Sequence, residues 1–174
     1  SSSLATQLNG SKKVVEIVST KFGFAALCAD GSVMTWGGTS GPVGATASQL
    51  DGSIDVVKLF STVGAFAALR SDGSVVTWGG EGGNSSAVAS QLDGNVDVVE
   101  VFSNSSAFAA LRADGSVVTW GSGGVGGDSS GVTSQLDGSV DVVKVYSTDS
   151  AFAALRADGS VVTWGNGDGG GDSS

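Results

Sequence analysis

The 174-residue sequence contains no histidine, and it has only one cysteine and one proline. Without histidine, the Ser-His-Asp and Cys-His arrangements of nucleophilic enzymes cannot form, and most kinds of zinc site are excluded. The single cysteine, Cys28, excludes a disulfide framework within the chain. Because proline is nearly absent while glycine contributes 29 residues, we expect many tight turns rather than polyproline linkers.

Charged side chains are also scarce, and the positive ones are the rarer kind. Eight Lys and Arg stand against 17 Asp and Glu, which gives a net charge of −9. Such a chain repels the phosphates of nucleic acids and of anionic membranes, and no basic cluster offsets the repulsion. No apolar run reaches the ~18 residues that suggest a membrane-spanning helix. We therefore expect no nucleic acid partner and no direct membrane insertion, and we expect another protein or a protein complex as the partner.

Hydrophobic residues make up 40% of the chain and recur at fixed positions, which argues against disorder. The four tryptophans are 42, 42 and 44 residues apart, and an Asp-Gly pair precedes each of them in the same register. The signature positions are Trp36, Trp78, Trp120 and Trp164, and Asp30, Asp72, Asp114 and Asp158. This period predicts four tandem repeats in a single domain, approximately residues 1–43, 44–85, 86–129 and 130–174.

Each repeat carries the signals of several short strands. In the third copy, residues 96–103, 107–113 and 116–121 are rich in β-branched and apolar side chains. The Asp114-Gly115 pair between the last two runs predicts a tight turn, because glycine accepts positive φ and the Asp side chain bonds nearby backbone amides. A short fourth element ends at Gly138. Helical periodicity is absent, so we expect an all-β protein with three to four antiparallel strands in each repeat.

Both faces of these strands carry apolar residues, so both should be covered. A single repeat could not bury its Phe, Leu and Trp side chains alone, whereas stacked neighbouring repeats could. Strands of this number at this period fit the blade of a β-propeller. The predicted fold is therefore a β-propeller-like protein of four blades.

The segment FAALRADGSVVTWG at residues 108–121 resembles the signature of the RCC1-like repeats, the regulator of chromosome condensation type. In that signature an apolar strand with Ala-Leu leads to Asp-Gly and then to a strand that ends in Trp-Gly. All four copies carry it, at residues 24–37, 66–79, 108–121 and 152–165. The resemblance covers essentially the whole chain, and it implies propeller blades that serve mostly as a binding platform. The repeat is shorter than is usual in the family, and four copies are fewer than the seven blades that the family usually closes.

The blade count leaves three arrangements open. The chain could form a compact four-bladed ring, an open arc, or half of a larger ring that a homodimer completes. Residues 171–174 and 1–4 resemble two parts of the same inter-repeat stretch, so we expect a whole number of repeats.

The polar residues that best suit a partner contact are Arg70, Arg112 and Arg156. Each ends the second strand of its repeat, so the three should lie at one height and could bind an anion or a carboxylate. Alternatively, each Arg pairs with an aspartate of a neighbouring repeat, Asp55, Asp97 or Asp141. Cys28 holds the equivalent position in the first repeat and is interpreted as a tolerated substitution.

No catalytic, cofactor-binding or metal-binding residue is expected. The recurring aspartates suffice as turn residues, and the tryptophans suit packing better than a ligand platform. The Gly- and Asp-rich stretch at residues 165–172 offers oxygen atoms of the kind that Ca²⁺ prefers, but it lacks the tandem nine-residue repeat of known calcium loops. Calcium binding there stays open.

The sequence therefore favours a non-enzymatic protein–protein interaction or scaffold module. Its inter-repeat loops, at residues 38–47, 80–90, 121–134 and 166–174, differ between copies and are candidates for partner contact. One alternative is a structural accessory subunit of a larger assembly, membrane-associated or photosynthetic. Another is a propeller-based glycosidase or lyase, which would need converging carboxylates.

Overall fold

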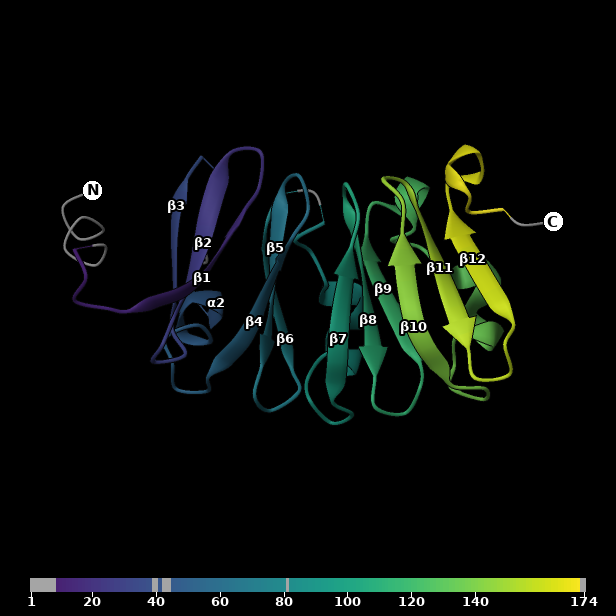
Figure 1. The fold of residues 1–174 in the computed structure, drawn as a ribbon, viewed down its shortest axis with the longest axis horizontal. Coiled ribbons are helices and arrows are strands. Elements are labelled where there is room, and N and C mark those ends of the chain that lie inside the picture. Colours follow the sequence, from purple (N-terminus) through teal and green to yellow (C-terminus); the bar gives the residue numbers. More distant parts are fainter. Residues whose placement is uncertain (1–8, 39–40, 42–44, 81, 173–174) are drawn as a thin grey trace.

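The computed structural model describes residues 9–38, 41, 45–80 and 82–172 of the chain. Within these residues, twelve strands form four separate three-stranded antiparallel sheets, and a few short helical segments lie between them (Figure 1). We call the sheets, in chain order, blades 1 to 4. The strands are β1 (Val14–Ser19), β2 (Gly23–Cys28) and β3 (Val33–Gly37); β4 (Val56–Ser61), β5 (Ala65–Arg70) and β6 (Val75–Gly79); β7 (Val98–Ser103), β8 (Ala107–Arg112) and β9 (Val117–Gly121); β10 (Val142–Ser147), β11 (Ala151–Arg156) and β12 (Val161–Gly165). The helical segments are α2 (Ala45–Ser48) and the 3₁₀ segments η1 (Ser86–Gln91), η2 (Gly123–Val125), η3 (Ser130–Gln135) and η4 (Gly167–Gly169).

The Asp-Gly turn between the second and third strands forms as the sequence predicts. In blade 2, Asp72 Oδ1 accepts hydrogen bonds from the Ser74 backbone N–H at 3.1 Å and from the Ser74 hydroxyl at 2.6 Å. Gly73 between them has a φ of +75°. The other three blades repeat this arrangement at Asp30, Asp114 and Asp158. The aspartates are therefore turn residues in every repeat.

The fourth element of the repeat is a short helical segment rather than a strand: α2 after β3, and the 3₁₀ segments η1 and η3 after β6 and β9. After β6 the chain turns back along that strand, where the Val75 N–H donates to the Leu92 carbonyl at 2.9 Å. The Thr77 hydroxyl donates to the Gly83 carbonyl at 2.8 Å. The returning chain thus contacts the outer edge of the third strand, which would otherwise be open to pairing with another strand.

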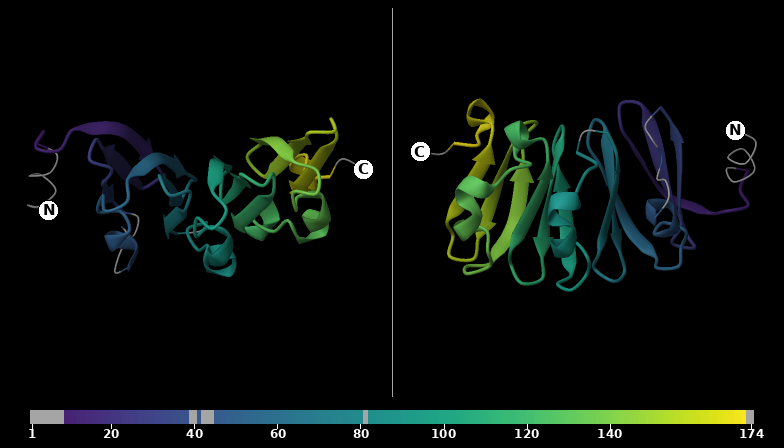
Figure 2. Two further views of the ribbon diagram at one scale, coloured as in Figure 1. Left: turned by 90° about the horizontal axis from the view of Figure 1, so that it is seen from below. Right: turned by 180° about the vertical axis from the view of Figure 1, so that it is seen from behind.

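The four blades stand side by side in chain order, with the two termini at opposite ends of the row (Figure 1). The first strands of successive blades lie against one another, and the helical segments lie on the opposite side of the row (Figure 2). The described residues therefore form an open array, and the compact four-bladed ring is not formed. None of the described helices is long and apolar enough to cross a membrane.

Three of the four core clusters in the described residues are joints between neighbouring blades, and the fourth consists of Ala26, Cys28 and Met34 in blade 1. In the joint between blades 1 and 2, Ala25 and Leu27 of β2 pack against Leu59, Phe66 and Trp78 of the next blade. Phe66 and Trp78 stack with ring centroids 5.3 Å apart, and both are buried. The prediction that the tryptophans serve packing is confirmed for Trp78, Trp120 and Trp164, which are at most 5% exposed. Trp36, in blade 1, is only partly buried.

Candidate functional site

The three arginines each form an ion pair within their own turn. Arg70 lies 3.2 Å from Asp72, and the equivalent pairs Arg112–Asp114 and Arg156–Asp158 measure 3.5 and 3.9 Å. The arginine side chains are only 10–15% exposed. The alternative pairing with an aspartate of a neighbouring repeat is wrong, because within the described residues each ion pair of these arginines stays inside its own repeat. The contact of the arginines with a partner stays a prediction.

Asp55, Asp97 and Asp141 instead pack against the glycine turn of the preceding blade. A Cβ built on Gly31 would lie 2.7 Å from the Asp55 Cα, and Gly73 and Gly115 face Asp97 and Asp141 in the same way. The turn and the next blade are therefore in direct backbone contact, for which only a glycine leaves room.

In blade 1 a lysine replaces the missing arginine. Cys28, at the position of the arginine, is a buried free cysteine. Instead, Lys12 Nζ lies 2.7 Å from Asp30 Oδ2 and donates a hydrogen bond to the Ser32 hydroxyl at 2.6 Å. The other repeats have Ile54, Val96 and Val140 at the position of Lys12. The hydrogen bonds from Lys12 and Ser32 lower the pKa of Asp30 from 3.8 to about 2. All four turns thus pair the aspartate with a cation.

Replacing Lys12 by methionine should raise the pKa of Asp30 from about 2 toward its ordinary value of 3.8. Since the folded-state pKa is depressed, the pair stabilises the fold above pH 4, and this stabilisation is lost as the pH falls toward 2. Both side chains are solvent-exposed, so the loss in unfolding free energy should stay below about 1 kcal/mol. An NMR titration of the Asp30 carboxyl in both proteins measures the shift. A Lys13→Met variant is the control, and an unchanged pKa in Lys12→Met would contradict the ion pair.

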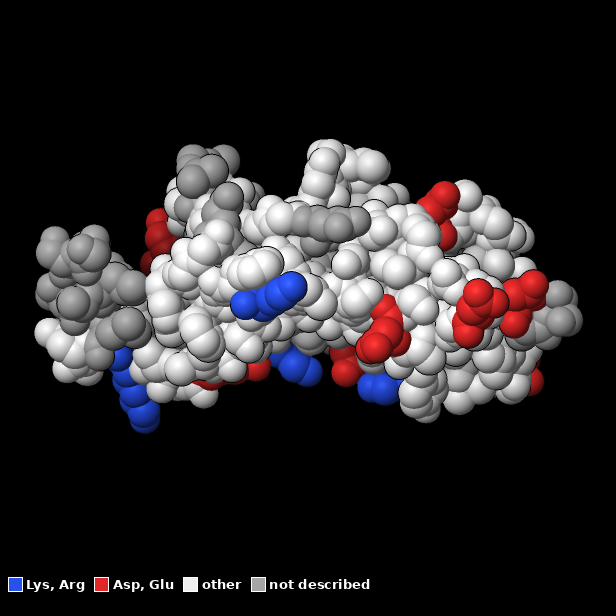
Figure 3. Space-filling view, turned by 90° about the horizontal axis from the view of Figure 1, so that it is seen from above, with Lys and Arg blue, Asp and Glu red and all other residues white. Residues whose placement is uncertain are grey.

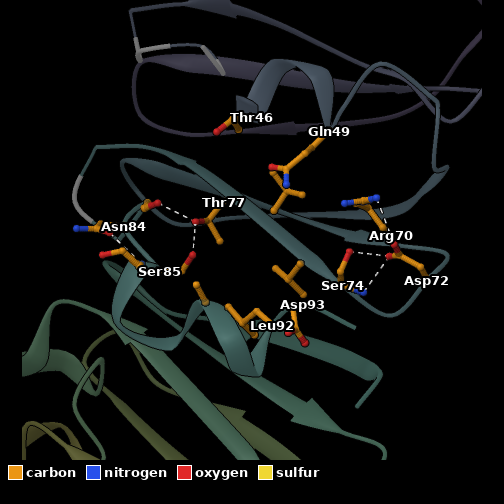
Figure 4. A pocket seen from close by; sticks show the side chains of 15 residues that line it. Thr46, Gln49, Arg70, Asp72, Ser74, Thr77, Asn84, Ser85, Leu92 and Asp93 are labelled. Atoms are coloured by element: carbon orange, nitrogen blue, oxygen red, sulfur yellow. Dashed lines mark hydrogen bonds and ion pairs between the residues drawn. The ribbon is translucent and has the colours of Figure 1, made fainter. Parts of the chain in front are cut away.

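A polar groove runs beside the arginine of blade 2, with a volume of about 440 Å³ (Figure 4). Thr46 of α2 and Gln49 just after it lie on one side of the groove, and Asn84 and Ser85 lie on the other (Figure 4). Arg70, Asp72 and Ser74 lie at one end of the groove (Figure 4), and β6 contributes to its lining. Amide, hydroxyl and guanidinium groups therefore face the same space, and they suit a segment that both donates and accepts hydrogen bonds.

The same groove recurs one blade further along the chain, with a volume of about 340 Å³. Gln91, Arg112 and Thr119 occupy the repeat positions of Gln49, Arg70 and Thr77. The 3₁₀ segments η1 and η3 supply further lining residues, Val88 and Thr133. The loops that vary between copies thus line the two grooves, and each groove contains one of the predicted arginines.

A third hollow, of about 750 Å³, lies where the four first strands end. It is lined mainly by hydroxyl-bearing and amide-bearing residues at or just after the ends of these strands, among them the last residues of the strands, Ser19, Ser61, Ser103 and Ser147. The sequence did not predict this hollow. The pattern that could have indicated it is the serine that ends the first strand in all four repeats.

The carboxylates of the grooves are committed to the turns. Burial raises the pKa of Asp72, but the hydrogen bonds from Ser74 and the charge of Arg70 outweigh burial, and the pKa lies below 3.8. Asp114 has the same surroundings and the same lowered pKa. Both groups therefore stay ionised near neutral pH, which does not suit a general acid.

Charged side chains are thinly spread over the surface. Figure 3 shows them as separated spots on one face, with no basic cluster. In the part of the chain that the structure describes, no group of three or more His, Cys, Asp or Glu could hold a metal ion. In the C-terminal loop, the Asn166 side chain accepts a hydrogen bond from the Gly169 N–H, and η4 follows from this turn.

Comparison with solved structures places the fold among known propellers. The ectodomain of the receptor kinase CR4 from Physcomitrella patens matches 88% of the chain with a TM-score of 0.58 and 17% identity. Yeast RCC1 (Prp20), in complex with Kap60, matches 87% with a TM-score of 0.58 and 17% identity. Human WBSCR16 matches 89% with a TM-score of 0.56 and 20% identity. The chain covers only 42%, 43% and 48% of these three proteins.

No protein-family model matches the sequence, and a search of curated proteins found no match. The fold assignment rests on the repeat signature together with the structural similarity. Four three-stranded blades in a row match the yeast RCC1 structure over 87% of the chain. The chain has the RCC1-like repeat fold.

Proposed function

We propose that the chain is a non-enzymatic scaffold that binds an extended segment of a protein partner in the grooves between its blades. The observation that carries the proposal is the recurrence of one polar groove in two successive blades, with Arg70 and Arg112 at equivalent positions. A groove that repeats along a rigid array can hold successive stretches of one partner chain. Among the proteins that share the fold, yeast RCC1 is bound by Kap60 in its crystal structure.

Several features weigh against the glycosidase or lyase alternative. The sequence contains no histidine. The recurring aspartates accept hydrogen bonds from the serines of their own turns, and those of blades 2 to 4 also pair with arginines. Carboxylates held in this way do not converge on a common space as a glycosidase requires.

In a selection from phage-displayed random peptides, we expect the wild-type protein to enrich peptides that need the groove arginines. Replacing Arg70 and Arg112 together by glutamine should raise the Kd of the selected peptides about tenfold or more, because hydrogen bonds to charged groups contribute about 1.5–3 kcal/mol. Fluorescence anisotropy of labelled peptides measures the change.

Two further variants make this test specific. Lys58 is an exposed cation outside both grooves, so Lys58→Gln controls for the loss of charge and should leave the Kd unchanged. Gln49 and Gln91 are exposed groove residues that take no part in the turns, so replacing both by alanine probes the grooves without loss of an ion pair. If the selected peptides bind the groove variants as tightly as they bind Lys58→Gln, the proposal fails.

The accessory-subunit alternative is supported by a different observation. The two outer faces of the array expose large apolar side chains, among them Ile17 at one end and Val161 at the other. Apolar faces of this kind are usually covered by another chain.

A further inference from the structure

Every joint inside the array is made from two different faces. The face of a blade that points to the next blade is mostly aliphatic. In blade 1 it includes Ala25, Leu27 and Val33, and in blades 2 and 3 Phe60 and Phe102 also pack there. The face that points to the preceding blade is aromatic, and in blade 2 it includes Phe66 and Trp78. The joints between blades 2 and 3 and between blades 3 and 4 use the equivalent residues. The chain thus forms one kind of joint three times.

Backbone hydrogen bonds accompany each joint at two places. At one, the Val56 N–H donates to the Gly31 carbonyl at 3.0 Å, and the next two joints repeat this bond at 2.9 Å. At the other, a bond runs from the Lys21 N–H to the Val63 carbonyl at 2.8 Å, and its equivalents join Val63 to Ser105 and Ser105 to Asp149. Each of the two bonds therefore has the same donor side and the same acceptor side at all three joints.

The first blade exposes part of the aromatic face that the other three blades bury, although Ala26 and Met34 on this face are buried. Phe24 is 44% exposed, whereas its equivalents in blades 2 to 4 are at most 1% exposed. Ile17 is 58% exposed, whereas Leu59, Val101 and Val145 at the same position are at most 3% exposed. In blades 2 to 4 the preceding blade covers these positions, whereas in blade 1 the stacking of Phe24 on Trp36 is kept at 5.3 Å.

The fourth blade exposes the complementary aliphatic face. Val161 is 57% exposed, whereas Val75 and Val117 at the same position are 8% exposed. Tyr146 is 58% exposed, at the position where Phe60 and Phe102 pack into a joint. Gly159 has no atom within 4 Å of a built Cβ, although the equivalent glycines touch the next blade.

We infer that these two faces bind each other between two copies of the chain, head to tail, and that two copies close a ring of eight blades. The occupant of each end is a second copy because each end presents one half of the joint that the chain already forms three times. The joint would continue the internal series, with the Val14 N–H donating to the partner copy at Gly159.

Charge at the ends also fits this pairing. At the internal joints an aspartate of the next blade contacts the Asp-Gly turn, so two acidic residues come together. Lys13 occupies that aspartate position in the first repeat. At the joint between two copies, Lys13 would therefore meet the Asp158-Gly159 turn with the opposite charge, which favours pairing between copies.

The size of proteins with this fold also fits two copies. A head-to-tail joint gives a ring if the rotation closes and a filament if it does not. The chain covers 42% to 48% of the three proteins compared above, so two copies correspond to about one such protein. The end faces are separate from the grooves, so pairing of copies does not depend on what the grooves bind.

Light scattering coupled to size exclusion, over a range of concentrations, tests the inference. We expect a mass of about 34 kDa, twice the 17.0 kDa of one chain. Val161→Asp should reduce it to about 17 kDa, because a carboxylate would be buried at the joint. The matched control is Val143→Asp, since Val143 and its equivalents are 51–56% exposed in all four blades and lie in no joint. It should leave the mass at 34 kDa.

The other end of the array has its own matched pair of variants. Ile17→Asp should also give a monomer, and Val15→Asp is its control, since Ile17 and Val15 are 58% and 56% exposed. A mixture of Ile17→Asp and Val161→Asp keeps one intact joint and should recover a species of about 34 kDa that neither variant forms alone. Pairing of like ends would not give this recovery. A wild-type monomer at every concentration, an open-ended ladder of sizes, or a Val161→Asp protein that still dimerises would each overturn the inference.

Discussion

Replacing Phe108 by alanine is expected to lower the free energy of unfolding by about 3–5 kcal/mol. Phe108 is fully buried in the joint between blades 2 and 3, where it stacks on Trp120 with ring centroids 5.2 Å apart. Its removal leaves a cavity between two sheets that are held together mainly by such contacts. Urea denaturation followed by tryptophan fluorescence gives the change, with Val161→Asp present in all proteins so that pairing of copies does not contribute.

The repeat offers a matched control for this substitution. Phe24 has the same position in blade 1 and the same stacked tryptophan partner, Trp36, but it is 44% exposed. In the same background, Phe24→Ala should therefore lower the free energy of unfolding by about 1 kcal/mol, since much of the ring is already in water. Equal losses for the two variants would show that stacking within a blade, rather than packing between blades, stabilises the array.

The elements that the sequence predicted correctly depend on local interactions. The Asp-Gly turn forms because the aspartate side chain accepts hydrogen bonds from the backbone N–H and the hydroxyl of the serine two residues later. These bonds do not depend on the rest of the chain. The strands and the burial of Trp78, Trp120 and Trp164 follow from the repeat, because one repeat cannot bury these side chains alone.

The ion pairs of the arginines could not be predicted in the same way. Arg70 can reach both Asp72 of its own turn and Asp97 of the next repeat in a sequence-based argument, and only the path of the backbone decides between them. The pair of Lys12 with Asp30 did have a signal. The first repeat has a lysine where the other repeats have Ile or Val, and it is also the one repeat that lacks the arginine. The two differences together indicate that the lysine replaces the arginine as the cation beside the aspartate.

The shape of the array was also beyond the sequence. Whether four blades close depends on the angle between neighbouring sheets, which is set by the size of the side chains at each joint. Alanines at two positions of the aliphatic face let the sheets approach closely, but the sequence does not show by how much the first strands converge. The shape of the grooves also depends on the angle between neighbouring sheets. The sequence could therefore predict only the arginines and the variable loops that line them.

Replacing Gly115 by alanine is expected to lower the free energy of unfolding by about 2–5 kcal/mol. Two costs combine. Gly115 has a φ of +75°, which costs an L-residue about 1–2 kcal/mol. A Cβ there would also lie 2.7 Å from the Cα of Asp141, a backbone atom that no side-chain rotation can move away, and such overpacking costs about 1–3 kcal/mol. Urea denaturation in the Val161→Asp background measures the sum.

Gly159→Ala separates these two costs, because Gly159 has a similar φ of +84° and nothing within 4 Å of its built Cβ. In the same background it should lower the free energy of unfolding by only about 1–2 kcal/mol. If the two variants lose the same free energy, the contact between the turn and the next blade is not tight, and the joints are looser than the structure shows.

The same Gly159→Ala substitution, made in the otherwise wild-type chain, should also weaken the association of two copies. At the inferred joint Lys13 of the second copy takes the place that Asp141 has opposite Gly115, so the added methyl group would meet backbone there as well. We therefore expect Gly159→Ala to be mild in a monomer and disruptive to the dimer. A dimer that tolerates the methyl group would show that the copies do not reproduce the internal joint.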